Sequence, residues 1–115
     1  MNEIKIITEK ISKEDLRGMS KIFFGDLVKA VVDCKKRIMA VGGELHSDEE
    51  QLLIERGSHQ SDLWGINLYP EKDGVEWIEF DSMINIRPSQ GNRSRGVENL
   101  EDQDIIRGVV NELTE

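Results

Sequence analysis

The alternation of apolar and polar residues predicts a helix near the start of the chain. Leu16, Met19 and Phe23 recur at helical spacing and would form one apolar face. Ser12, just before this run, is suited to cap the helix, and Gly25 would end it in the left-handed conformation. Two more helices are expected, a short one over 47–57 capped by Ser47, and a terminal one after Asn99 with the apolar stripe Ile105, Ile106, Val109, Val110 and Leu113.

Alternation with period two predicts five strands. The segments concerned are 4–8, 27–33, 37–41, 63–69 and 77–87, with a hairpin turn over 33–36 between the second and the third. The last segment is the longest, and we expect it to bend near Asp81 and Ser82. Pro88 would end it, because proline has no N–H to give to the ladder.

These elements follow one another in the order β-α-β-β-α-β-β-α, which predicts an α+β fold. A single mixed or antiparallel sheet of about five strands with three helices explains why hairpins, rather than regular βαβ units, dominate the pattern. Because strands covered on both faces usually appear as continuous apolar runs, the alternation favours helices packed on one face only. We expect residues 1–115 to form one domain.

The balance of charge narrows the range of functions. The chain of 115 residues carries 15 Lys and Arg against 23 Asp and Glu, a formal net charge of −8. Such a field repels phosphate, so it disfavours broad nucleic-acid binding and anionic membrane surfaces without excluding a local basic site. Cys34 is the only cysteine, and no apolar run approaches the ~20 residues that cross a bilayer. We therefore expect a cytoplasmic protein that does not associate with membranes.

One stretch departs from this acidic character. The residues from Arg87 to Gly96 include three arginines, two serines, two side-chain amides and two glycines, but no carboxylate. Arginine matches a phosphate or carboxylate bidentately, and glycines let backbone N–H groups turn toward an anion. The loop therefore predicts a binding module for a small phosphate- or carboxylate-bearing ligand. Its candidate ligand-binding residues are Arg87, Ser89, Asn92, Arg93, Ser94 and Arg95.

Three other interpretations of this loop stay open. Its arginines could pair with carboxylates of the same chain and simply hold the loop in place. The protein could instead be an enzyme, a phosphate-ester hydrolase or nuclease, in which the arginines stabilise developing charge and His46 or Asp81 acts as base. That reaction requires His46 or Asp81 to lie close to the loop. The loop and an edge strand could also form a homo-oligomeric or partner interface.

Other candidate chemistry is less specific. Glu44, His46 and Asp48 would share one side of an extended segment and could ligate a metal, but a helix that starts near Ser47 would turn Asp48 away. The chain has no H-E-x-x-H spacing, no phosphate-loop motif and no dinucleotide fingerprint. Cys34 lies in a lysine-rich turn without a histidine nearby in sequence. We therefore predict neither a metal nor another cofactor.

Three blocks of sequence carry a family resemblance. They are AVGGELH at 40–46, LWGINLYP at 63–70 and DSMINIRPSQGNRSRGVE at 81–98. In these blocks the chain resembles a family of small uncharacterised prokaryotic proteins, known as a domain of unknown function. The resemblance covers nearly the whole chain and implies a stand-alone member of that family. It implies no activity, substrate or catalytic residue.

Overall fold

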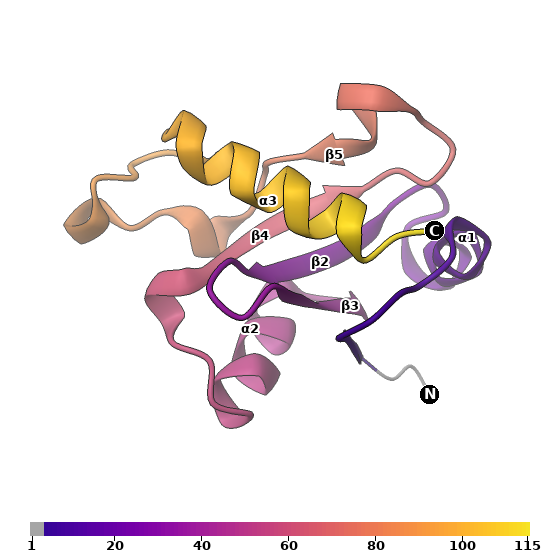
Figure 1. Ribbon diagram of the computed structural model, residues 1–115, viewed down its shortest axis with the longest axis horizontal. Helices are drawn as coiled ribbons and strands as arrows, with labels where there is room; N and C mark the ends of the chain where they lie inside the picture. The colour runs from indigo at the N-terminus through magenta and orange to yellow at the C-terminus, as the bar shows by residue number, and fades with distance from the viewer. Residues whose placement is uncertain (1–3) are drawn as a thin grey trace.

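A computed structural model describes residues 4–115 of the chain. Within this range the chain forms helices on either side of one sheet, and Figure 1 shows their arrangement. In chain order the helices and strands are β1 (Lys5–Ile7), α1 (Lys13–Phe23), β2 (Val28–Asp33), β3 (Ile38–Gly43), α2 (His46–Glu55), β4 (Leu63–Leu68), β5 (Ile78–Glu79) and α3 (Leu100–Glu112). Short 3-10 helices join several of them.

The strands form one antiparallel sheet in the order β1-β3-β2-β4-β5. This confirms the predicted α+β class. β2 lies at the centre, joined to β3 by the predicted hairpin and paired with β4 from Val28 opposite Leu68 to Asp33 opposite Leu63. The turn ends at Arg37, whose φ of 57° lies in the left-handed region. The short β1 and β5 form the two edges.

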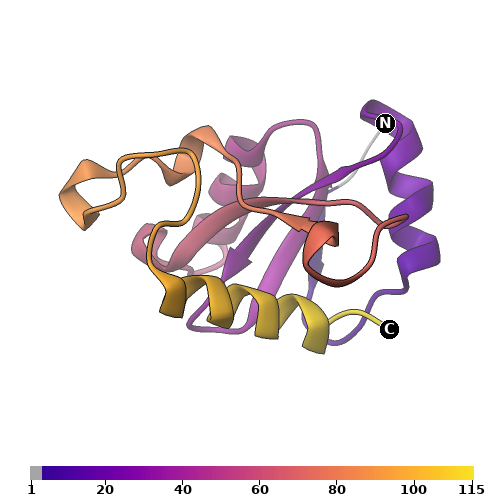
Figure 2. The ribbon, with the colours of Figure 1, turned by 90° about the horizontal axis from the view of Figure 1, so that it is seen from above.

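Helices cover both faces of this sheet, so the expectation of a one-sided helix layer is wrong. On β2, Ala30 and Val32 pack into the main core with apolar residues of α1 and α3. Val31 packs on the other face with Leu53 of α2. Figure 2 shows α3 on one side of the sheet and α2 on the other. The second layer is small, and Lys29 shares its face of β2 with Val31, which is why the pattern indicated a single covered face.

Local signals at the helix ends are largely confirmed. The Ser12 hydroxyl accepts a hydrogen bond from the backbone of α1 at 3.0 Å, and the Asn99 side chain caps α3 in the same way. Helix α2 is the exception, because it begins at His46, one residue before the predicted cap Ser47. The residue in the cap position, Leu45, has no side-chain oxygen to accept a hydrogen bond.

The predicted long last strand is the main error of the sequence analysis. β5 contains only Ile78–Glu79, and Trp77 before it lies in a 3-10 helix. Beyond β5 the chain continues as an irregular segment over residues 80–98, which we call the strap. The side chain of Asn85 in the strap takes the place of a pairing strand. Its Oδ1 accepts the N–H of Gly65 at 2.8 Å, and its Nδ2 donates to the Gly65 carbonyl at 2.9 Å.

Glu49 is a fully buried acid on the sheet side of α2. Its Oε2 accepts the N–H of Gly43 at 2.9 Å, while its Oε1 has no hydrogen-bond partner among residues 4–115. Burial raises the pKa of Glu49 well above its ordinary value of 4.5, so the folded state keeps the proton that the unfolded state releases. Stability should therefore fall as the pH rises above that ordinary value, by at most about 1.4 kcal/mol per pH unit.

We expect the Glu49→Gln variant, which mimics the protonated side chain, to be more stable than the wild type at about pH 8 and nearly equal to it at about pH 4. Urea denaturation at a series of pH values measures the difference. Glu44→Gln, which removes an exposed carboxylate nearby, is the control and should show no such gain. Parallel pH profiles for the wild type and Glu49→Gln would contradict a protonated Glu49.

Candidate functional site

The arginine-rich loop is a folded part of the strap, and it projects at the left of Figure 1. The N–H of Arg87 donates to the Asn92 carbonyl at 2.7 Å, and the return bond measures 3.1 Å. Asn92 is buried, and its side-chain amide donates to the carbonyls of Asn85 and Gly96, both at 2.8 Å. Its Oδ1 accepts the N–H of Glu98 at 2.9 Å. Asn92 is therefore engaged in holding the loop together.

Arg87 points into the protein and is only 8% exposed. Its Nε donates to the Ile84 carbonyl at 3.0 Å, and its Nη2 donates to the Leu63 carbonyl. Nη2 also lies 3.5 Å from a carboxylate oxygen of Glu50, and the guanidinium stacks on the Trp64 ring with its centre 4.9 Å from the centroid. Burial lowers the pKa of Arg87, and Glu50 opposes that shift. Arg87 therefore fastens the strap to β4 and α2.

A carboxylate of the same chain occupies the part of the loop best shaped for an anion. One oxygen of Glu98 accepts the backbone N–H groups of Arg93 at 2.9 Å and Ser94 at 2.8 Å. The Ser94 side chain and these two amides lower the pKa of Glu98. Successive N–H groups aimed at one oxygen form an anion-binding nest of the kind that the loop's composition predicted. Here Glu98 fills that nest.

The other predicted loop residues are exposed. Arg95 has its Nε 2.6 Å from Oδ1 of Asp81, and its Nη1 donates to the sulfur of Met83 at 3.6 Å. In the part of the chain that the structure describes, the side chains of Arg93 and Ser89 make no hydrogen bond or ion pair. Two of the three arginines thus have carboxylate partners within the chain, as one of the open interpretations held.

Arg95 and Asp81 border a cavity of about 300 Å³ on the α2 side of the sheet. We call it the strap cavity, because it lies where the strap meets the first turn of α2 and the ends of β2 and β4. Its polar lining consists of Lys29, His46, Ser47, Asn67, Asp81, Ser82 and Arg95. The lining of this cavity therefore contains one arginine of the loop, Arg95, and both residues considered as a base, His46 and Asp81.

A glycine in β4 allows the strap to approach the sheet at this point. A Cβ on Gly65 would lie 2.6 Å from the Cβ of Ser82, which is closer than real side chains come. The Ser82 N–H donates to the Arg95 carbonyl at 2.9 Å and joins the two arms of the strap. The Asp81 carbonyl in turn accepts from the Asn67 side chain at 3.3 Å. These contacts fix the wall of the strap cavity.

The strap cavity is locally basic in a chain whose net charge is −8. Two cations, Lys29 and Arg95, line it together with one carboxylate, Asp81. Lys29 forms no ion pair with any carboxylate in residues 4–115, and its ammonium lies 4.9 Å from the centroid of the Phe24 ring. With a neutral His46, the lining keeps a net positive charge.

His46 is buried at the first position of α2. Its Nε2 lies 2.8 Å from the Ile66 carbonyl, and because a carbonyl can only accept, Nε2 carries the proton. Burial lowers the pKa of His46 from its ordinary value of 6.5, which favours the neutral ring at pH 7. Nδ1 is then left with a lone pair that can accept a proton or a hydrogen bond.

Asn67 carries an unsatisfied acceptor at the strap cavity. The residue is 7% exposed, and its Nδ2 donates to a carboxylate oxygen of Glu79 at 2.9 Å. Its buried Oδ1 has no hydrogen-bond partner within 4–115. The first-turn N–H groups of His46 and Ser47 likewise find no acceptor in the described chain. Because Oδ1 has almost no exposed surface, a ligand in the cavity does not reach it, whereas the N–H groups at the start of α2 can donate to an anion.

Part of this site could be predicted from the sequence, and part of it could not. His46, Asp81 and Arg95 were candidates, each for a different reason. Lys29 and Asn67 were not, although they face each other across β2 and β4. The available signal was a polar residue within each of two largely apolar strands, but a single strand does not show which polar residues come together.

The described residues form neither a metal-ligand cluster nor a cysteine with a lowered pKa. No group of three or more His, Cys, Asp or Glu side chains within 4–115 is arranged to hold a metal ion. Because His46 already begins α2, Glu44 and Asp48 do not share an extended face with it. Burial raises the pKa of the Cys34 thiol to about 12, with Asp102 adding to the shift, so the nucleophilic thiolate is scarce near neutral pH.

Fold and site together define a class: a small antiparallel α+β protein with a basic cavity between a helix N-terminus and an irregular strap. None of the helices in the described range is long and apolar enough to cross a membrane. The chain belongs to the DUF5674 family, described as proteins of unknown function, whose model matches residues 5–113. No curated protein and no solved structure matches it. Because the family description assigns no activity, the function has to be argued from the site.

Proposed function

We propose that the protein is a binding module for a small anionic ligand, which occupies the strap cavity. The observation that carries the proposal is Lys29, a lysine that forms no ion pair within residues 4–115, in the same cavity as Arg95. This narrows the site predicted from sequence, because Arg87 is buried and Arg93 does not line the cavity.

The chemistry of the lining limits the ligand. A phosphate or carboxylate can accept from Lys29, from Arg95 and from the N–H groups at the start of α2 that have no acceptor within residues 4–115, where the helix dipole also favours negative charge. The cavity of about 300 Å³ is at the small end for ligand sites. A small carboxylate or a small sugar or glycerol phosphate fits these conditions.

Titration of the ¹⁵N-labelled protein with glycerol 3-phosphate, followed by NMR, tests the proposal. We expect saturable shifts of the Ser47 amide and the Asn67 side-chain amide, and affinity at least about tenfold lower for Lys29→Gln and for Arg95→Gln, which is about 1.4 kcal/mol each. Arg93→Gln is the matched control, because it removes the same charge from the same loop without touching the cavity.

Two results would overturn this assignment. One is the absence of any saturable shift at Ser47 and Asn67 up to about 10 mM ligand, because the dissociation constant would then be too high for a specific site. The other is an equal loss of affinity in Arg93→Gln and Arg95→Gln, because only a general effect of net charge would treat the two arginines alike.

A phosphate-ester hydrolase is the second candidate, favoured by the position of His46 and Asp81 beside Arg95 in one cavity. In such a reaction His46 takes a proton from the attacking water, Arg95 stabilises the charge on the phosphoryl oxygens, and the alcohol leaves with a proton from solvent. Turnover of a chromogenic aryl phosphate by the wild type, lost in His46→Gln while glycerol 3-phosphate still binds, would support it. Binding of glycerol 3-phosphate without turnover of the aryl phosphate would exclude the hydrolase and leave the binding module as the remaining proposal.

A further inference from the structure

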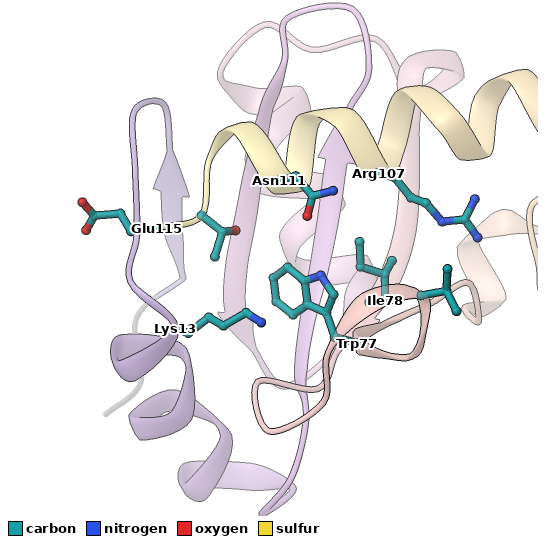
Figure 3. A pocket seen from close by; sticks show the side chains of 9 residues that line it. Lys13, Trp77, Ile78, Arg107, Asn111 and Glu115 are labelled. Atoms are coloured by element: carbon teal, nitrogen blue, oxygen red, sulfur yellow. The ribbon is translucent and has the colours of Figure 1, made fainter.

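A larger cavity lies on the other face of the sheet, on the side of α1 and α3. It measures about 540 Å³ and opens between the start of α1, the last turns of α3 and the 3-10 helix Gly74–Trp77. In Figure 3, Lys13 from α1 and Asn111 from α3 point toward the Trp77 ring, while Glu115 points away. The volume lies within the range of small-molecule sites.

One wall of this cavity is apolar. Trp77 and Ile78 belong to the main core and form its floor. Val75, also part of the lining, is 73% exposed. A ligand that covers Val75 removes this apolar surface from water, which is favourable. The cavity is therefore suited to an occupant with a flat apolar part.

Two cations lie at opposite ends of this wall (Figure 3). The Lys13 ammonium sits 4.5 Å from the centroid of the Trp77 ring, and its carboxylate partner, Asp73, is 3.6 Å away and 98% exposed. Arg107 has its Cζ 4.9 Å from the centroid of the Phe80 ring and its Nη1 3.5 Å from the Gln103 Oε1, and its ion pair with Asp104 spans 3.8 Å. Long, exposed ion pairs contribute little, so both cations stay available to a ligand.

We infer that this cavity binds a small amphipathic anion, with an aromatic or similarly flat apolar body and one carboxylate or phosphate group. Val75, Trp77 and Ile78 take the apolar body, and Lys13 or Arg107 takes the charge. An inorganic anion does not cover the apolar wall, and a neutral molecule leaves Lys13 and Arg107 with only their long ion pairs to Asp73 and Asp104. The inference does not depend on the strap cavity, which uses other residues on the opposite face.

NMR titration of the ¹⁵N-labelled protein with phenyl phosphate tests this inference. The reporters are the amides of Gly74 and Thr114 and the indole N–H of Trp77. We expect saturable shifts at these groups with phenyl phosphate. Benzyl alcohol, which keeps a ring without the charge, and inorganic phosphate, which keeps the charge without a ring, should each bind at least about tenfold more weakly.

Variants then test which side chains take the charge. Lys13→Gln combined with Arg107→Gln should lower the affinity for phenyl phosphate at least about tenfold. Arg56→Gln, which removes one exposed cation at the end of α2, should leave that affinity unchanged. No saturable shift at Gly74 and Thr114, or equal affinity of the wild type and the double variant, would overturn the inference. Shifts confined to Ser47 and Asn67 would also overturn it, while leaving the strap cavity's proposed role intact.

Discussion

Replacing Arg87 with methionine is expected to lower the free energy of unfolding by about 3–5 kcal/mol. Methionine cannot donate to the Leu63 and Ile84 carbonyls, which would lose their hydrogen bonds. It also leaves Glu50, whose side chain is only 13% exposed, without its cation. A buried charge that loses its partner destabilises far more than an exposed one. Urea denaturation followed by tryptophan fluorescence measures the loss.

Two further variants separate this structural role from general charge effects. Arg93→Met changes an exposed arginine of the same loop and should shift stability by no more than about 0.5 kcal/mol. Glu50→Gln combined with Arg87→Met removes both charges, so it should recover part of the loss. A loss below about 1 kcal/mol for Arg87→Met alone would show that Arg87 is free to serve a ligand, as the sequence analysis predicted.

The parts of the fold that could be predicted are those that neighbours in the chain determine. Ser12 and Asn99 act as helix caps because their side chains bond to amides within the next turn. Gly25 ends α1 with a φ of 89°, because glycine has no Cβ to oppose that conformation. The start of α2 was misplaced by one residue, since its cap position holds Leu45 and gives no polar signal.

The errors concern contacts between distant segments. Residues 77–87 have the alternating pattern of a strand. However, the side chain of Asn85, rather than its backbone, makes the hydrogen bonds to the N–H and carbonyl of Gly65 in β4. Similarly, the loop of 87–96 contains no acid, but Glu98 reaches back from just outside it and fills its nest. No spacing rule shows that a carboxylate beyond the segment will fold into it.

The strap cavity could be anticipated only in pieces for the same reason. Arg95 was a candidate because it lies in the arginine-rich loop, and His46 because it lies between two acidic residues. The two residues line one cavity only because the strap crosses β4. That crossing depends on Gly65, which a local pattern marks only as a weak point in a strand. The residues that complete the lining, Lys29 and Asn67, come together through the antiparallel register of β2 and β4.

Asn85→Ala is expected to destabilise the protein by about 3 kcal/mol or more, because three backbone groups lose a hydrogen bond and the two of Gly65 are buried. The Asn85 amide serves the N–H and the carbonyl of Gly65 and, through a bond of 2.9 Å, the carbonyl of Arg95. Arg95 should then also lose its place beside the strap cavity. Denaturation measures the first effect, and a lower affinity for glycerol 3-phosphate measures the second.

Asn85→Asp distinguishes this hydrogen-bonding role from simple packing, since the two side chains have nearly the same shape. A carboxylate keeps the acceptor for the Gly65 N–H but places negative charge against the Gly65 and Arg95 carbonyls. Burial and these carbonyls raise the folded-state pKa of the introduced carboxyl above its ordinary value of about 3.9, so the folded state holds the proton longer than the unfolded state. The stability deficit relative to wild type should therefore be small at about pH 4 and grow as the pH rises toward neutrality. A deficit independent of pH would mean that the side chain at position 85 is not held in this buried place against the two carbonyls, and the strap would need another explanation for its course across β4.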